Sequence, residues 1–188
     1  FPPLPADSDL ITGEASPSTF TSPEAPGLVA RALPDARLIL LLRDPVHLAY
    51  SHHAMDLRSH NVAISFETAV ARELEHLPTC PLEPGDLPGG YLTSSAALPH
   101  LRRWLAHVPP ERLLILQNRD LADDLPGVMR RVCRHIGIAS FVPPDPERHN
   151  VGSYPPMPEA LERRLRAWFA EHDRALAEFL GALPGPHA

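Results

Sequence analysis

The sequence predicts an α/β fold with a parallel sheet, and three observations lead to this prediction. The segment 36–42, with an unbroken apolar run from Leu38 to Leu42, is typical of a strand buried on both faces of a parallel sheet, and residues 112–117 form a second such segment around the apolar residues 113–116. Segments with the helical spacing of apolar residues lie between and after these runs. Because strands and helices alternate, we expect short crossovers between parallel strands and a single domain over residues 1–188.

Turn and capping residues set the bounds of the expected elements. A short strand at residues 10–12 comes first, and Pro34 ends the first helix. Asp44 and Pro45 supply an N-cap and a first helical residue, and Gly137 suits the end of a helix. The expected helices cover residues 23–33, 45–58, 66–77, 95–108 and 126–136, and a last one begins at Pro158 and carries Leu161, Leu165, Trp168, Leu176 and Phe179.

Composition argues against several classes of protein. Hydrophobic residues make up 44% of the 188 residues and charged residues 21%, which is enough for a packed core. The net charge of -6 argues against a nucleic-acid partner, and the longest apolar run is too short for a membrane segment. All 17 basic residues are arginine, so no step that needs a lysine ammonium can use this stretch. We expect a cytoplasmic location.

The first residue is Phe1, which suggests a processed chain or a fragment of a longer protein. Cys133 fits a buried helix position, and a disulfide with Cys80 is left open. Four histidines raise the possibility of a metal site, but their spacing does not place a ligand set on one helix face. A solvated helix is therefore the better interpretation of these histidines, which are His47, His52, His53 and His60.

Polar side chains follow the expected strands at the edge where α/β proteins bind ligands. Arg43 lies between an apolar run and a helix start, where its guanidinium could bind a phosphate. Ser51, under two turns into that helix, could add a hydroxyl. In the alternative interpretation, Arg43 pairs with Asp44 or Asp120 and Ser51 is a surface residue.

A carboxylate, Glu14, follows the first expected strand and is flanked by small residues. Such a group could act as a general base. The alternative is a solvated carboxylate that pairs with a nearby arginine. The sequence contains neither GxSxG nor HExxH, so it does not indicate a serine hydrolase of the nucleophile-elbow type or a zinc protease.

A series of short segments spans nearly the whole chain. They are residues 13–17 (GEASP), 33–45 (LPDARLILLLRDP), 49–52 (AYSH), 65–69 (SFETA), 101–105 (LRRWL), 111–116 (ERLLIL) and 148–157 (RHNVGSYPPM). Together and in this order they resemble the PAPS-dependent sulfotransferases, of the heparan sulfate N- and 3-O-sulfotransferase type and its bacterial relatives.

The resemblance implies a P-loop-kinase-like, three-layer α/β/α fold. It also implies transfer of a sulfuryl group, without a metal, from 3′-phosphoadenosine 5′-phosphosulfate (PAPS) to a hydroxyl or amino group, with PAP as product. The acceptor would be a carbohydrate or a small natural product. Arg43 and Ser51 fall on the family's pair that holds the 3′-phosphate, and Glu14 falls on the catalytic base. The late loop that closes over the nucleotide corresponds to Arg148, His149, Asn150, Gly152, Ser153 and Tyr154.

The family opens with a strand and a glycine-rich loop bearing a lysine, which cradles the 5′-phosphosulfate. Only nine residues precede the strand before Glu14. We therefore expect the fold to lack its first strand and this loop within the 188 residues, which would leave neighbouring strand edges unpaired. Two alternatives remain: a catalytically inactive sulfotransferase-like protein that binds a nucleotide or a partner, and a nucleotide kinase of the same fold.

Overall fold

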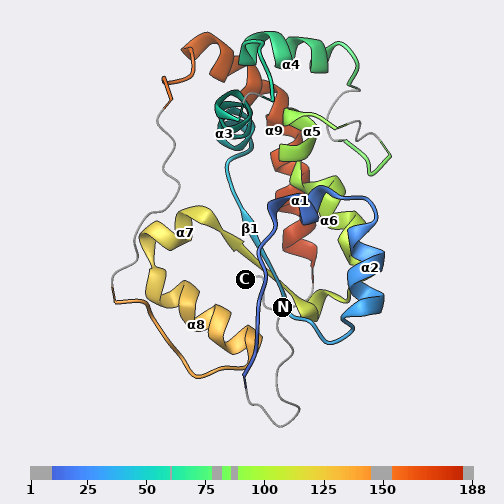
Figure 1. Cartoon of the computed structure of the whole chain (residues 1–188), viewed down its shortest axis with the longest axis vertical. Coiled ribbons are helices and arrows are strands. Elements are labelled where there is room, and N and C mark those ends of the chain that lie inside the picture. Colours follow the sequence, from blue (N-terminus) through green and yellow to red (C-terminus); the bar gives the residue numbers. More distant parts are fainter. Residues whose placement is uncertain (1–9, 60, 78–81, 86–88, 145–153, 184–188) are drawn as a thin grey trace.

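A computed structural model of the protein describes residues 10–59, 61–77, 82–85, 89–144 and 154–183. It confirms the α/β class, with most of the described residues in helices (Figure 1). Its elements are α1 (Pro17–Thr21), α2 (Ala25–Ala32), β1 (Leu38–Leu42), α3 (Pro45–Arg58), α4 (Phe66–Leu74), α5 (Tyr91–Ser95), α6 (Ala97–Leu105), a 3-10 turn (Pro110–Arg112), β2 (Leu113–Gln117), α7 (Asn118–Asp123), α8 (Leu125–Ile136) and α9 (Glu159–Ala182).

The sheet consists of β1 and β2, which pair in parallel with Leu38 opposite Leu113 and Leu42 opposite Gln117. In the part of the chain that the structure describes, the sheet has these two strands alone, so each strand is paired along one edge and has no strand on its other edge. That a further strand belongs at one of these edges stays a prediction.

Helices cover both faces of the sheet, which gives the three layers that the resemblance implied (Figure 1). On one face, Leu42 and Ile115 pack with Leu101 of α6 and with the C-terminal half of α9. On the other face, Leu114 and Leu116 pack with Val128 of α8. The side chains of β1 that point to this second face are Ile39 and Leu41, which are 44% and 39% exposed.

A second core lies at the carboxyl end of β1, where α3, α4, α5 and the N-terminal half of α9 meet. Its largest fully buried side chain is Phe169 of α9. Because α9 has 24 residues, its two halves contribute to both cores and fix α3 relative to the sheet. The buried members of this core are Val46, Ala49, Phe66, Val70, Leu82, Leu92, Ala96, Leu161, Leu165 and Phe169.

Capping residues bound three of the helices, and two of them, Asp44 and Gly137, act as the sequence predicted. Asp44 accepts a hydrogen bond from His47 N at 2.9 Å at the start of α3, and Ser65 accepts one from Thr68 N at the start of α4. Gly137 ends α8 in the left-handed conformation, with φ of 79°. These caps depend on interactions between residues only three or four positions apart, so a local sequence pattern is enough to predict them.

One expected element is wrong. Residues 10–12 are irregular, and Leu10 and Ile11 are 69% and 59% exposed, so no burial stabilises a strand there. The helix expected at 95–108 is α6, and a separate short helix, α5, which was not expected, precedes it with a break at Ala96. Pro99 explains the break, since its ring would collide with the carbonyl four residues earlier, and it is tolerated in the first turn of α6. The short helices α1 and α7 were not expected.

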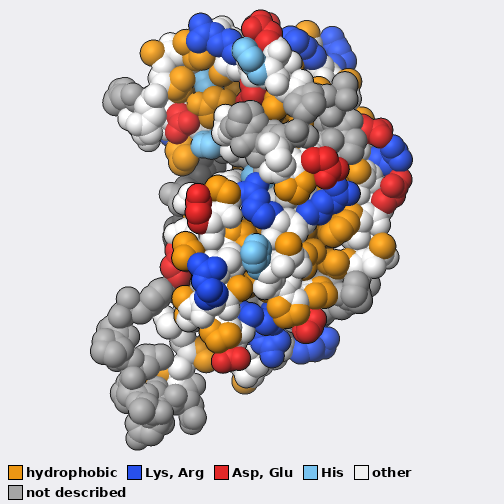
Figure 2. Space-filling view, turned by 90° about the vertical axis from the view of Figure 1, so that its right-hand side faces the viewer, with side chains coloured by type: hydrophobic (Ala, Val, Ile, Leu, Met, Phe, Trp, Pro, Cys, Tyr) orange, Lys and Arg blue, Asp and Glu red, His pale blue; other side chains and the backbone are white. Residues whose placement is uncertain are grey.

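The surface carries charges of both signs close together. Figure 2 shows arginine and acidic side chains interspersed over one face. Along α9, Arg163 pairs with Glu159 and Arg174 pairs with Glu171 and Glu178. Exposed pairs of this kind contribute little stability each. Within the ranges that the structure describes, no helix is both long and apolar enough to cross a membrane.

Candidate functional site

The junction of β1 and α3 holds the first predicted phosphate ligand, Arg43. Its side chain is exposed at the carboxyl end of the strand, directly after the buried Leu42. Arg43 makes no hydrogen bond or ion pair with any residue in the described part of the chain. The alternative partners are engaged elsewhere: Asp44 accepts a hydrogen bond from Arg166 at 3.0 Å, and Asp120 lies 3.7 Å from Arg119. The guanidinium of Arg43 is therefore available to a ligand.

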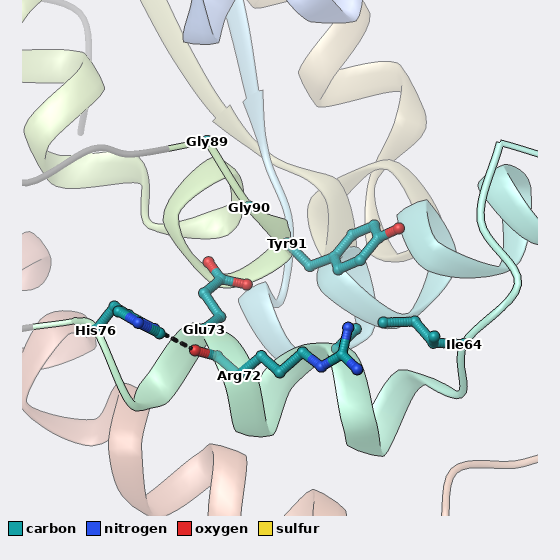
Figure 3. A pocket seen from close by; sticks show the side chains of 8 residues that line it. Ile64, Arg72, Glu73, His76, Gly89, Gly90 and Tyr91 are labelled. Atoms are coloured by element: carbon teal, nitrogen blue, oxygen red, sulfur yellow. Dashed lines mark hydrogen bonds between the residues drawn. The ribbon is translucent and has the colours of Figure 1, made fainter.

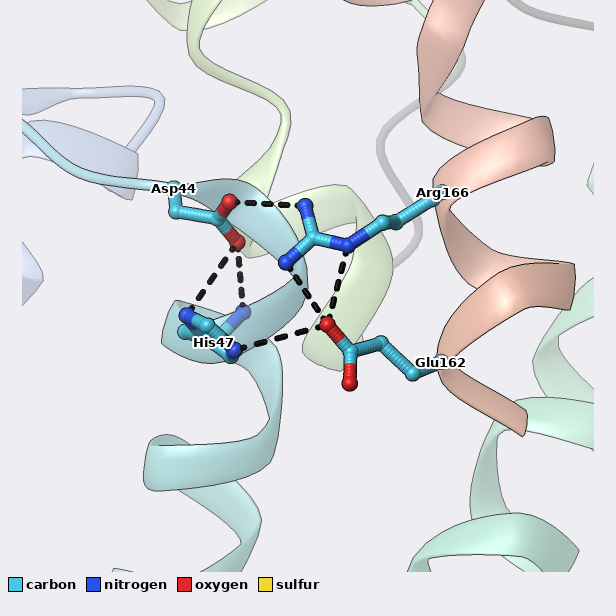
Figure 4. A network of polar contacts seen from close by, with 4 residues as sticks. All are labelled: Asp44, His47, Glu162 and Arg166. Atoms are coloured by element: carbon cyan, nitrogen blue, oxygen red, sulfur yellow. Dashed lines mark hydrogen bonds and ion pairs between the residues drawn. The ribbon is translucent and has the colours of Figure 1, made fainter. Parts of the chain in front are cut away.

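Asp44 belongs to a network that ties α3 to α9 (Figure 4). Arg166 of α9 contacts Asp44 and also Glu162, at 2.9 Å from Nε and 2.7 Å from Nη2. His47 lies 3.8 Å from Asp44 and 3.7 Å from Glu162. Partial burial raises the pKa of Asp44, but the hydrogen bonds from His47 N and Arg166 outweigh it, so the pKa is lower than usual. Asp44 is thus held as a carboxylate.

Ser51, the second predicted phosphate ligand, is half-buried in the first half of α3. Among the described residues its hydroxyl has no hydrogen-bond partner. Both Arg43 and Ser51 lie at the carboxyl end of β1, one in the junction and one in the helix that follows it. Whether the two side chains share one anion stays a prediction.

Tyr50 connects α3 to the end of the late segment. Its hydroxyl donates a hydrogen bond to the carbonyl oxygen of Pro155 at 2.9 Å. Its ring meets that of Tyr154 edge-on, with centroids 5.3 Å apart. Tyr154, the one late-loop candidate within the described ranges, therefore packs on α3 one residue from Ser51. The other candidates of that loop, Arg148, His149, Asn150, Gly152 and Ser153, lie outside the described residues.

Tyr50 was not among the residues singled out from the sequence. The available signal was its position immediately before Ser51 in the segment AYSH. Its role depends on a contact between residues 105 positions apart, which no local pattern indicates.

Glu14, the predicted base, is exposed in the irregular segment before α1. Ser16 Oγ donates a hydrogen bond to its carboxylate. Within the described ranges, no arginine pairs with Glu14, and no hydrogen bond joins it to Arg43 or Ser51. The carboxylate is thus accessible to an acceptor, and its role as a base stays a prediction.

The histidines of α3 differ from the expected solvated set. His53 is buried, and its Nε2 lies 2.9 Å from the carbonyl oxygen of Ile64. His52 lies 3.8 Å from Asp56 and meets Tyr91 edge-on, whereas His47 belongs to the network with Asp44. The interpretation as a solvated face is therefore wrong for His53, which points into the core. Among the residues described, no group of three or more ligating side chains could hold a metal ion.

A hollow of about 350 Å³ lies between α4 and the start of α5 (Figure 3). Glu73 points from α4 to Gly90, and its carboxylate accepts hydrogen bonds from Leu92 N and Thr93 N at 2.9–3.1 Å. A Cβ on Gly90 would collide with the Glu73 carboxylate. The Tyr91 hydroxyl donates to Asp56 at 3.0 Å. These groups hold α5 to α3 and α4, so we assign the hollow a structural role.

Comparison with known proteins shows to which family the chain belongs. A sequence profile of the sulfotransferase family matches residues 5–143. The bifunctional heparan sulfate N-deacetylase/N-sulfotransferase 3 of Homo sapiens is 31% identical over 138 residues, covering 72% of this chain and 16% of that protein. The heparan sulfate glucosamine 3-O-sulfotransferase 3B1 of Mus musculus is 30% identical over 138 residues, covering 70% of this chain and 32% of that protein.

Solved structures show the same fold. A crystal structure of a sulfotransferase from Alicyclobacillus acidocaldarius superposes with a TM-score of 0.65 at 24% sequence identity. The match covers 85% of this chain and 60% of that structure. The chain thus spans only part of the length of these relatives. Since the family profile covers most of the 188 residues, the chain belongs to the sulfotransferase family.

Proposed function

We propose that the protein transfers the sulfuryl group of PAPS to a hydroxyl or amino group of a carbohydrate or small natural product. Family membership supports sulfuryl transfer. Relatives named for heparan sulfate support a carbohydrate acceptor. The observation that carries the proposal is the exposed guanidinium of Arg43 at the carboxyl end of β1, which has no partner among the residues that the structure describes. Residues 1–188 would form part of one sulfotransferase domain.

The nucleotide would bind across the β1–α3 junction. Arg43 can form charge-assisted hydrogen bonds to the 3′-phosphate, and Ser51 can add a hydroxyl from α3. Tyr154, held by Tyr50, would line the same region. We assign the remaining contacts of the late segment to Arg148, His149, Asn150, Gly152 and Ser153, on the strength of the resemblance.

In the chemical step, Glu14 would take a proton from the acceptor O–H or N–H. The acceptor lone pair forms a bond to sulfur while the bond between sulfur and the oxygen of the 5′-phosphate breaks. That oxygen keeps the electron pair and leaves as part of PAP, so negative charge grows on the phosphate. Since these 188 residues contain no lysine, any stabilisation that they give must come from arginine, histidine or N–H donors.

Calorimetric titration of the full-length protein with PAP tests the site. A charge-assisted contact contributes roughly 1.5–3 kcal/mol, so Arg43→Ala should weaken PAP binding about ten- to a hundredfold. The matched control is Arg37→Ala, an exposed arginine at the opposite end of β1, which should change the affinity less than about twofold. Equal PAP affinity of Arg43→Ala and wild type would contradict the assignment.

Activity is tested separately. The full-length protein is incubated with PAPS and a panel of saccharides and small acceptors, and mass spectrometry follows both PAP and the sulfated product. Transfer to any acceptor supports the enzyme. Tight PAP binding without transfer to any acceptor would favour the inactive, nucleotide-binding alternative.

A further inference from the structure

The carboxylate of Asp44, next to Arg43 in the sequence, can compete with a phosphate for the Arg43 guanidinium. Asp44 directly follows Arg43, and a second carboxylate, Glu162 of α9, lies close to Asp44, since Arg166 contacts both of them. An arginine surrounded by free carboxylates would pair with them and bind an anionic ligand less well. The structure contains a feature that prevents this pairing.

Both oxygens of Asp44 are occupied by groups other than Arg43. Oδ2 accepts a hydrogen bond from Nη1 of Arg166 at 3.0 Å. Oδ1 accepts one from His47 N at 2.9 Å. Figure 4 shows the guanidinium of Arg166 between the carboxylates of Asp44 and Glu162, so this one arginine forms ion pairs with both acids. Arg166 comes from α9, 122 residues after Asp44.

We infer that Arg166 is a positioning residue for nucleotide binding: by pairing with Asp44 it keeps that carboxylate from Arg43 and leaves the Arg43 guanidinium available to a phosphate. The inference rests on the proposed role of Arg43 in the nucleotide site. It adds a residue of the C-terminal helix, which does not itself touch the nucleotide, to the determinants of affinity. Neither the family profile, which ends at residue 143, nor the quoted motifs include Arg166.

The test is calorimetric titration of the full-length protein with PAP. Arg166→Ala frees Asp44, and because exposed ion pairs are weak, we expect a loss of affinity of about two- to fivefold. Arg166→Lys keeps a cation that can reach Asp44 and should stay within about twofold of wild type. The matched control is Arg163→Ala, which removes an exposed arginine of the same helix that is paired to a glutamate one turn earlier but not to Asp44.

A double-mutant cycle distinguishes an effect through Arg43 from the general electrostatic effect of losing one positive charge. If Arg166 acts through Arg43, then Arg166→Ala should cause no further loss in the Arg43→Ala background. If it acts through the general field, the two losses should add. Asp44→Asn in the Arg166→Ala background should restore affinity, since asparagine still caps α3 and has no charge to offer Arg43.

The outcomes keep the two proposals apart. An unchanged affinity in Arg43→Ala would overturn the proposed nucleotide site itself. A large loss in Arg43→Ala, together with equal affinities for Arg166→Ala and Arg163→Ala, would overturn only the inference about Arg166. Additive losses in the cycle would also overturn it. Thermal melting of each variant shows whether the β1–α3 region is still folded at the temperature of the titration.

Discussion

Arg112 and Ala36, which are 76 residues apart, are joined by two hydrogen bonds to one carbonyl oxygen. Nε of Arg112 donates to the oxygen of Ala36 at 3.0 Å and Nη2 donates at 2.9 Å, while Nη2 also reaches the oxygen of Leu33 at 2.8 Å. Arg112 immediately precedes β2, and Ala36 lies two residues before β1. The contact therefore fixes the amino ends of the two strands side by side in the register that pairs Leu38 with Leu113.

Arg112→Leu should lower the free energy of unfolding of the full-length protein. The substitution removes the charged donor of three hydrogen bonds, but water can reach the exposed carbonyl of Leu33, so we expect a loss of about 1–2 kcal/mol. Arg37→Leu is the matched control, because Arg37 is exposed at the start of the other strand, and it should cost less than about 0.5 kcal/mol. Urea denaturation measures both. Equal losses would show that the contact does not stabilise the strand pair.

Much of the fold could be predicted because the signals were local. The apolar run of β1, the cap at Asp44 and the left-handed Gly137 each involve residues a few positions apart. Pro99 was also a local signal, and its effect four residues upstream explains the division between α5 and α6. The strand expected at residues 10–12 does not form, because its two apolar side chains stay exposed and their burial therefore does not stabilise strand pairing.

The candidate site was only partly predictable. The free guanidinium of Arg43 agrees with the phosphate hypothesis, but what keeps it free is Arg166, whose contact with Asp44 depends on how α9 packs against α3. In the same way, His53 looks polar in the sequence, yet the turn of α3 points it into the core. Contacts between distant elements determine both the availability of Arg43 and the burial of His53, and residue spacing within one helix cannot predict such contacts.

His172 should make the protein less stable in mild acid. It is 1% exposed, and neither ring nitrogen has a hydrogen-bond partner in the described part of the chain. Burial, followed by the charge of His100, lowers the pKa of His172 from 6.5 to about 4. Below pH 6.5 the unfolded chain binds this proton and the folded chain does not, so stability should fall progressively from pH 6.5 to 4, by roughly 3 kcal/mol at most.

Denaturation of the His172→Phe variant between pH 7 and 4.5 checks this expectation. Removing the titrating group should flatten the pH dependence, and part of the slope should remain because burial also lowers the pKa of His100. His107→Gln, which changes an exposed histidine, is the control and should keep the wild-type slope. An unchanged slope in His172→Phe would assign the acid sensitivity to other groups.

Tyr50→Phe should weaken PAP binding modestly. The variant keeps the ring contacts with Tyr154 and Phe66 but loses the hydrogen bond to Pro155. A hydrogen bond contributes about 0.5–1.5 kcal/mol, so we expect an affinity about two- to tenfold lower if Tyr154 lines the nucleotide site. Tyr91→Phe is the matched control, since it also loses one tyrosine hydrogen bond, to Asp56, away from residues 154 and 155. Equal PAP affinities of the two variants would contradict a role of Tyr50 in the site.

Glu14→Gln should separate chemistry from binding. If Glu14 takes the proton of the acceptor, losing it should lower kcat about 10²–10⁴-fold and leave PAP affinity nearly unchanged, the reverse of Arg43→Ala. Glutamine keeps the size of the side chain and can still accept a hydrogen bond from Ser16. Glu24→Gln is the control, because Glu24 is an exposed acid nearby whose carboxylate also accepts a serine hydrogen bond, from Ser22.

Sulfuryl transfer from PAPS by the full-length protein, measured per folded molecule, should collapse only in Glu14→Gln. Full turnover in that variant would mean that another group is the base, and His52 of α3 would then be the next candidate, since it follows Ser51 and is partly exposed.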